Sequence, residues 1–162
     1  LGPLPEAGRR ARVLIVGIGN ALRGDDAAGL AVARRLRGRV PPGVAVIERE
    51  GDLAGMIDAW EGAEAVIVID ASGPRGAPGS IERFEAHDRP LPAKALRGST
   101  HAIGVADAIE LSRALGSLPA SVIVYAIEGR RFGTGEAPSP EFESAVEKVV
   151  SKVLEEPCMK CR

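Results

Sequence analysis

The chain has 162 residues, of which 45% are hydrophobic and only 3% aromatic, and its net charge is −1. This length suits one domain with a core of aliphatic side chains, and the composition excludes a disordered chain. The near-zero charge argues against nucleic-acid and membrane partners, and no apolar run is long enough to cross a bilayer. With no basic segment leading into an apolar one at the N-terminus, and two cysteines in all, we expect a cytoplasmic protein.

Strand-like and helix-like runs alternate along the chain. The predicted strands cover 11–17, 44–48, 64–70, 80–86 and 121–127, and the predicted helices cover 25–37, 53–60, 102–115 and 141–154. This alternation predicts an α/β fold with a mostly parallel, five-stranded twisted sheet flanked by helices on both faces. We expect one domain over 1–162, with flexible segments at 1–9 and 156–162.

Several details follow from local signals. The first helix is expected to begin at an Asp25 N-cap and to stop at Gly38. The alternation in 80–86 indicates an edge strand. The helix over 102–115 is expected to bury Ile103, Ala106 and Ile109, with Leu111 as a further candidate. The loops at 73–79 and 128–140 are rich in glycine and proline and are expected to help select the substrate.

Three polar residues stand where strands end or helices begin. Asp26 follows the first strand, Asp70 ends the third, and His101 precedes the helix over 102–115. In α/β sheets ligands bind at the carboxyl ends of the strands, so we expect these side chains to converge there. Two carboxylates and one imidazole, with coordination positions left open, suit a transition metal that must also bind a substrate.

Each of these residues also has a structural interpretation. Asp26 could complement a helix dipole, Asp70 could be a solvated strand end, and a single histidine is more often structural than a ligand. The other histidine, His87, lies in a polar loop and is expected to be solvated.

The glycine-rich turn after the first strand is the most distinctive string of the chain. Gly17 and Gly19 are spaced as in dinucleotide-binding folds, but Leu22 stands where the third glycine belongs, and no phosphate-binding lysine is present. A tight strand-to-helix turn explains these glycines better. The chain also lacks a zinc-protease helix motif and a serine nucleophile elbow.

The combined motifs resemble those of the hydrogenase maturation proteases. The opening string over 17–29 (GIGNALRGDDAAG), the strand over 66–71 (VIVIDA) and the segment over 99–104 (STHAIG) match that family in order and spacing. The resemblance runs from about Val13 to about Leu154. It departs from the family pattern at Ala27, where many members have glycine, and over 50–52, where an acid and two glycines are usual.

The resemblance implies a cytosolic endopeptidase that removes a short C-terminal extension from a nickel–iron hydrogenase large-subunit precursor after nickel insertion. It places both the metal ligands and the catalytic residues at Asp26, Asp70 and His101. Nickel would be supplied by the precursor, and we expect a monomer or a weak oligomer. A metal-oriented water would then attack the peptide bond, and an acid could act as general base.

Two alternatives stay open. A non-catalytic nickel-binding or precursor-checking module could use the same fold, and so could a metal-dependent peptidase with an unrelated substrate. The tail over 156–162 (EPCMKCR) also resembles the metal-binding end of a mature large subunit. It could therefore mimic the substrate in a protease cleft, its own or a neighbour's, although coincidence explains so short a match more readily. Alternatively, Cys158 and Cys161 are incidental thiols in a floppy end.

Overall fold

The computed structural model describes residues 11–50, 52–92, 95–96 and 102–160. The predicted N-terminal flexible segment, Cys161 and His101 therefore lie outside the described residues. The elements, in chain order, are β1 (Val13–Ile18), the 3-10 helix η1 (Gly24–Ala27), α1 (Ala28–Leu36), β2 (Val44–Arg49), α2 (Leu53–Trp60), β3 (Ala65–Ser72), β4 (Ile81–Glu85), α3 (Ala102–Ala114), β5 (Ser121–Glu128), α4 (Phe142–Leu154) and α5 (Pro157–Lys160). None of the helices in these ranges is long and apolar enough to cross a membrane.

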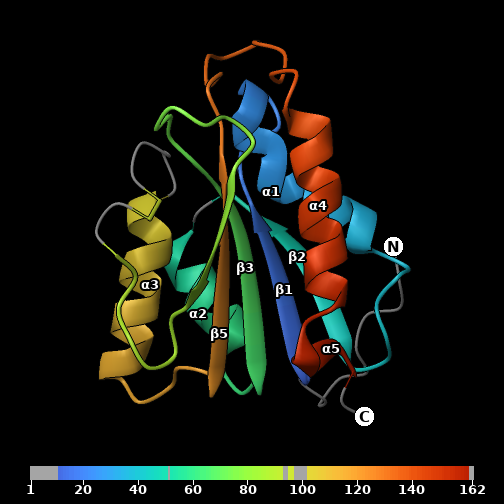
Figure 1. Cartoon of the computed structure of the whole chain (residues 1–162). Coiled ribbons are helices and arrows are strands. Elements are labelled where there is room, and N and C mark those ends of the chain that lie inside the picture. The colour runs from blue at the N-terminus through green and yellow to red at the C-terminus, as the bar shows by residue number, and fades with distance from the viewer. Residues whose placement is uncertain (1–10, 51, 93–94, 97–101, 161–162) are drawn as a thin grey trace.

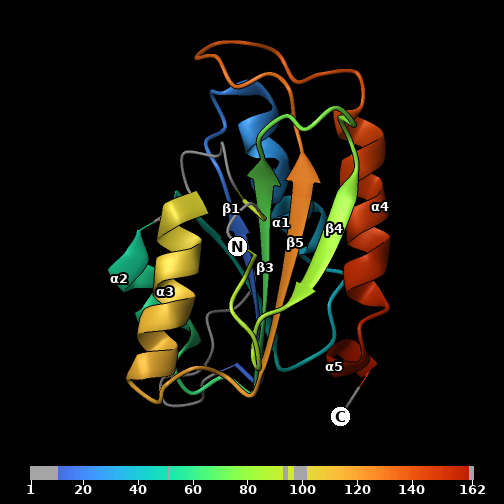
Figure 2. The same cartoon turned by 60° about the vertical axis from the view of Figure 1, so that its left-hand side comes forward.

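The five strands form one sheet in the order β2-β1-β3-β5-β4. All neighbours are parallel except β4 and β5, which are antiparallel (Figure 2). The central strand β3 is buried along its whole length, whereas β4 exposes Glu82, Arg83 and Glu85. Charged residues on an edge strand discourage pairing with another chain. The predicted fold class is confirmed, including the edge position of the 80–86 strand.

Helices cover both faces of the sheet. Helices α1 and α4 lie on one face, and α2 and α3 lie on the other (Figures 1 and 2). Alternate strand residues enter the two layers, so Val13 and Ile15 pack in one apolar cluster and Leu14 and Val16 in the other. In the second layer the buried Trp60 Nε1 donates a 2.9 Å hydrogen bond to Ser112 Oγ, which joins α2 to α3.

Glycines let the first helix approach the carboxyl ends of the strands. A Cβ on Gly29 would overlap the carbonyl oxygens of Ile18 and Ile69, the former in β1 and the latter in β3. A Cβ on Gly19 would overlap the Asp26 carbonyl oxygen, and one on Gly17 would overlap that of Gly29. These glycines therefore serve close strand–helix packing, as expected for a tight turn, and they bring η1 against β3.

Three local expectations differ from the structure. Asp25 is not an N-cap, because it lies inside η1 and neither η1 nor α1 starts with a side-chain cap. Helix α3 buries Ile109 as expected, but Ala106 is half-buried and Leu111 is exposed. The side chain of Ile103 lies outside the described part of the structure, and the other buried residues of α3 are Val105, Ala108 and Ser112. His87 is half-buried rather than solvated, since its Nδ1 accepts a 3.2 Å hydrogen bond from the Val122 N–H.

The C-terminal residues 156–160 are packed, in contrast to the flexible segment expected at 156–162. Met159 is buried in the same apolar cluster as Val13 and Ile15, on the α1 and α4 face of the sheet. Arg12 donates a 2.9 Å hydrogen bond to the Cys158 carbonyl oxygen. Helix α5 lies at the end of the sheet from which β3 and β5 point away (Figure 2). Helix α5 thus lies at the amino ends of the parallel strands.

A buried carboxylate fastens this tail. Glu156 accepts hydrogen bonds from Arg83 Nε at 2.7 Å and from the Tyr125 hydroxyl. Burial alone would raise the pKa of Glu156, but these hydrogen bonds outweigh it and the pKa is lowered. The ion pair of Glu156 and the buried Met159 hold residues 156–160 against the rest of the fold, which the general tendency of chain ends to disorder did not predict.

Candidate active site

Asp26 lies in η1, directly after the tight turn that leaves β1. Its side chain is fully buried, and η1 packs against β3. The turn closes on itself, because the Asp26 N–H donates to the Arg23 carbonyl oxygen at 3.0 Å and the Asn20 N–H donates to the Asp26 carbonyl oxygen at 3.3 Å. The backbone around Asp26 is thus fixed locally as well as by the strands.

Asp70 lies near the carboxyl end of β3, which continues to Ser72, two residues further than predicted. The side chain is fully buried, and its Oδ1 accepts a 2.8 Å hydrogen bond from the N–H of Ala71. Asp70 alternates in phase with Val66 and Val68, so it faces the layer formed by α2 and α3.

The structure therefore brings two of the three predicted residues to one region. Gly29 lies between the carboxyl ends of β1 and β3, and the turn before it carries Asp26 against the strand that holds Asp70. Burying carboxylates costs free energy, so two buried acids at one sheet edge indicate a functional site. His101 immediately precedes α3 but is outside the described residues. Among the residues that are described, no group of three or more His, Cys, Asp or Glu could hold a metal ion.

Sequence reasoning missed the role of Asp25. Its side chain is only 3% exposed and accepts hydrogen bonds from the N–H groups of Arg130, Arg131 and Ser139 and from Ser139 Oγ, at 2.8 to 3.0 Å. Burial would raise the pKa of Asp25, but these hydrogen bonds outweigh it and hold the pKa below its ordinary value. No local signal could have shown this, because all of the donors lie more than a hundred positions away in the chain.

The loop that joins β5 to α4 (residues 129–141) is tied to the turn after β1 at further points. The Asp25 N–H donates to the Arg131 carbonyl oxygen at 2.7 Å, and the Gly135 N–H donates to that of Leu22 at 2.7 Å. Arg23 Nε donates to the Phe132 carbonyl oxygen at 3.0 Å. The two loops thus form one unit beside Asp26, with Leu22 70% exposed on its surface.

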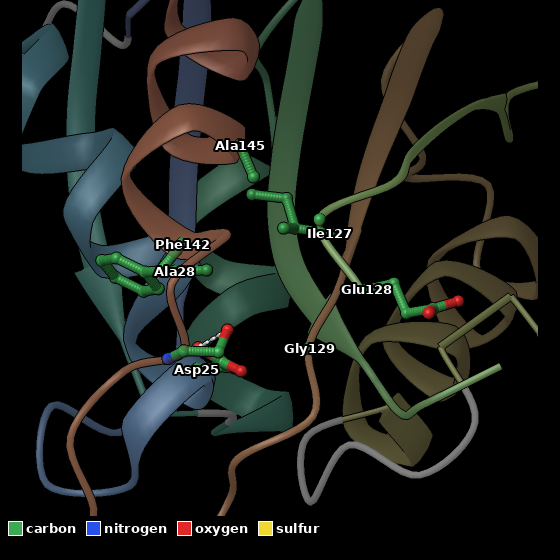
Figure 3. A pocket seen from close by; sticks show the side chains of 9 residues that line it. Asp25, Ala28, Ile127, Glu128, Gly129, Phe142 and Ala145 are labelled. Atoms are coloured by element: carbon green, nitrogen blue, oxygen red, sulfur yellow. Dashed lines mark hydrogen bonds between the residues drawn. The ribbon is translucent and has the colours of Figure 1, made fainter. Parts of the chain in front are cut away.

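Neither of two hollows in the described part of the chain is lined by Asp26 or Asp70. The first, shown in Figure 3, has a volume of about 10 Å³ and lies between Asp25, Ile127 and Ala145. It is just large enough for one water molecule and too small for a peptide. The second, about 450 Å³, is lined by Arg83, Phe84 and residues of the segment 85–92.

The hydrogen bonds already made by the acids limit which of them could hold a metal. A carboxylate offers about four acceptor positions, and those of Asp25 are filled by four donors. Asp25 is therefore not suited to ligation, and Asp26, Asp70 and His101 remain the predicted ligands. Two carboxylate oxygens together with an imidazole nitrogen fit a divalent ion such as nickel.

Comparison with known proteins agrees with this architecture. A model of the hydrogenase maturation protease family matches residues 31–156, a range that includes Asp70 and His101 and begins just after Asp26. A hydrogenase maturating endopeptidase, HybD from Escherichia coli, has a TM-score of 0.78 at 23% identity, with 88% of this chain and 90% of that chain covered.

Two archaeal structures are also similar. The [NiFe] hydrogenase maturation protease HybD from Thermococcus kodakarensis has a TM-score of 0.68 at 27% identity, covering 88% of this chain and 96% of that chain. The hydrogenase 2 maturation peptidase from Thaumarchaeota archaeon SCGC_AB-539-E09 has a TM-score of 0.64 at 29% identity, covering 89% and 96%. Comparison with curated protein sequences gives no match. The family match spans well over half of the chain and confirms the resemblance seen in the sequence: this chain belongs to the hydrogenase maturation protease family.

Proposed function

We propose that this chain is a nickel-recognising endopeptidase that removes a short C-terminal extension from a nickel–iron hydrogenase large-subunit precursor after nickel insertion. The observation that carries the proposal is a pair of buried acids, Asp26 and Asp70, in a chain of the maturation protease family. The acids lie where an α/β sheet binds its ligands, at the carboxyl ends of the parallel strands.

In this proposal Asp26, Asp70 and His101 are both the metal ligands and the catalytic residues. The nickel ion belongs to the substrate and arrives with it. Coordination of the nickel by these side chains would hold the precursor with its scissile peptide bond beside the acids. Such positioning raises the rate of cleavage. A carboxylate at this place can also take a proton from the attacking water as a general base.

The remaining expectations stay predictions that accompany this function. They are dependence on metal, a cytoplasmic location, a monomeric or weakly associated state, and the absence of nucleic-acid partners. The single-domain organisation over 1–162 is likewise a prediction for the chain as a whole.

Cleavage is expected to depend on nickel in the precursor. The protein would be incubated with two preparations of a hydrogenase large-subunit precursor from the same source, one loaded with nickel and one nickel-free, and the precursor C-terminus followed by mass spectrometry. We expect a defined C-terminal peptide from the loaded precursor only. Binding of the loaded precursor without cleavage would favour the non-catalytic module. Equal cleavage of both preparations would show that nickel is not what the enzyme recognises.

A further inference from the structure

The adjacent acids Asp25 and Asp26 occupy different environments and divide two tasks. We infer that Asp25 is a positioning residue: it clamps the β5–α4 loop onto the turn that carries Asp26, and precursor cleavage depends on this clamp. The inference rests on the proposed function and assigns a role to a residue outside the set Asp26, Asp70 and His101.

The contacts of the Asp25 carboxylate exclude a direct chemical role. Oδ1 accepts from the Ser139 N–H at 2.8 Å and from Ser139 Oγ at 2.9 Å, and Oδ2 accepts from the N–H groups of Arg130 and Arg131 at 2.9 and 3.0 Å. With four donors, the carboxylate has no acceptor position left for a metal ion or a reacting proton. Its contacts lie instead at both ends of the β5–α4 loop.

The packing around Asp25 leaves little room for another arrangement. A Cβ on Gly129 would lie 2.6 Å from the Asp25 Cβ, and a Cβ on Gly24 would lie 2.5 Å from the Arg131 carbonyl oxygen. Gly24 also has a φ of +56°, which glycine adopts without strain. These glycines thus let the backbone of η1 approach the backbone of the β5–α4 loop closely, so that the short side chain of Asp25 reaches all of its hydrogen-bond donors.

Loss of the Asp25 carboxylate is expected to displace the neighbouring residue, Asp26. The N–H groups of Arg130, Arg131 and Ser139 would lose a buried acceptor, so that the loop must move to find others. Because Asp25 and Asp26 share η1, this movement shifts Asp26 against β3. A misplacement of about 1 Å in a catalytic group can lower a rate by about a hundredfold.

Asp25→Asn tests the clamp with nearly the same side-chain volume, and Ser139→Ala removes a single donor. Glu156→Gln is the matched control, because Glu156 is also a buried, hydrogen-bonded carboxylate but directly precedes α5, which lies at the opposite end of the sheet. For each variant kcat and KM would be measured with the nickel-loaded precursor, and amide hydrogen exchange in 129–141 would be measured on the free protein.

We expect Asp25→Asn to lower kcat roughly 10-fold to 100-fold, with a much smaller change in KM, and to speed exchange in 129–141. Ser139→Ala should show the same two effects more weakly. If Asp25→Asn does not fold, Ser139→Ala still tests the positioning role. Glu156→Gln should keep the wild-type kcat and the wild-type exchange in this loop.

The alternative is a purely structural role for Asp25. If folded Asp25→Asn and Ser139→Ala keep the wild-type kcat, the positioning role is wrong even where exchange becomes faster. Slower cleavage with unchanged exchange in 129–141 would also overturn the clamp. A wild-type protein that releases no peptide would mean that the proposed function has failed, and the positioning role would fall with it.

Discussion

Asparagine in place of Asp26 is expected to abolish cleavage of the nickel-loaded precursor while the fold is retained. The amide has nearly the volume of the carboxylate, but it carries no charge for the metal and cannot accept a proton at neutral pH. Positioned acid–base groups contribute about 10²- to 10⁴-fold, so kcat should fall by at least roughly 100-fold. Because asparagine has nearly the same volume and leaves no cavity, we expect the variant to stay folded.

Asp70→Asn should give the same loss, since both acids are proposed to act at one centre. Asp88→Asn is the control, because the side chain of Asp88 is 85% exposed in the loop after β4 and should affect neither rate nor stability. Rates from a precursor-cleavage assay would be compared with unfolding free energies from urea titration. Wild-type cleavage by Asp26→Asn would remove Asp26 from the site.

Gly29→Ala is expected to destabilise the protein by about 3 kcal/mol or more, or to prevent folding. The added methyl group would overlap the carbonyl oxygens of Ile18 and Ile69, which belong to two central strands and cannot rotate away. Overpacking in a core usually costs about 1–3 kcal/mol, and two backbone overlaps place this site at or beyond the upper end. Alanine is the better helix former by about 1 kcal/mol, but this gain is smaller than the cost.

Gly38→Ala is the matched control for the Gly29→Ala substitution. Gly38 has a φ of +78°, yet a Cβ there meets nothing within 4 Å, so only the cost of the left-handed backbone applies, about 1–2 kcal/mol. Urea titration of both variants would show the difference. Equal stability of Gly29→Ala and Gly38→Ala would contradict the close packing of α1 on the strand ends.

The order of elements could be predicted because apolar runs and glycines mark it directly. The run over 65–69 is buried in β3, and Asp26 and Asp70 are both buried. That they act together at the carboxyl ends of the strands remains a prediction. The buried face of α3 was predicted less well, because Ser112 faces the core to bond Trp60 while Leu111 is exposed. Hydrophobic periodicity cannot identify a polar core residue whose partner lies in another helix.

Features that depend on distant partners could not be predicted. Asp25 looked like a helix cap because the sequence shows only its neighbours, whereas its partners are Arg130, Arg131 and Ser139. The tail looked flexible because the ion pair of Glu156 with Arg83 is likewise non-local. The ligand role of His101 remains a prediction from sequence, and it is the part of the site that most needs an experiment.

The most direct test of the proposed site uses the two histidines of the chain. Wild-type protein, His101→Ala and His87→Ala would be incubated with the nickel-loaded precursor, and the released C-terminal peptide would be quantified by mass spectrometry. The proposal predicts the same peptide from wild type and His87→Ala and none from His101→Ala. Release of that peptide by folded His101→Ala at the wild-type rate would contradict it.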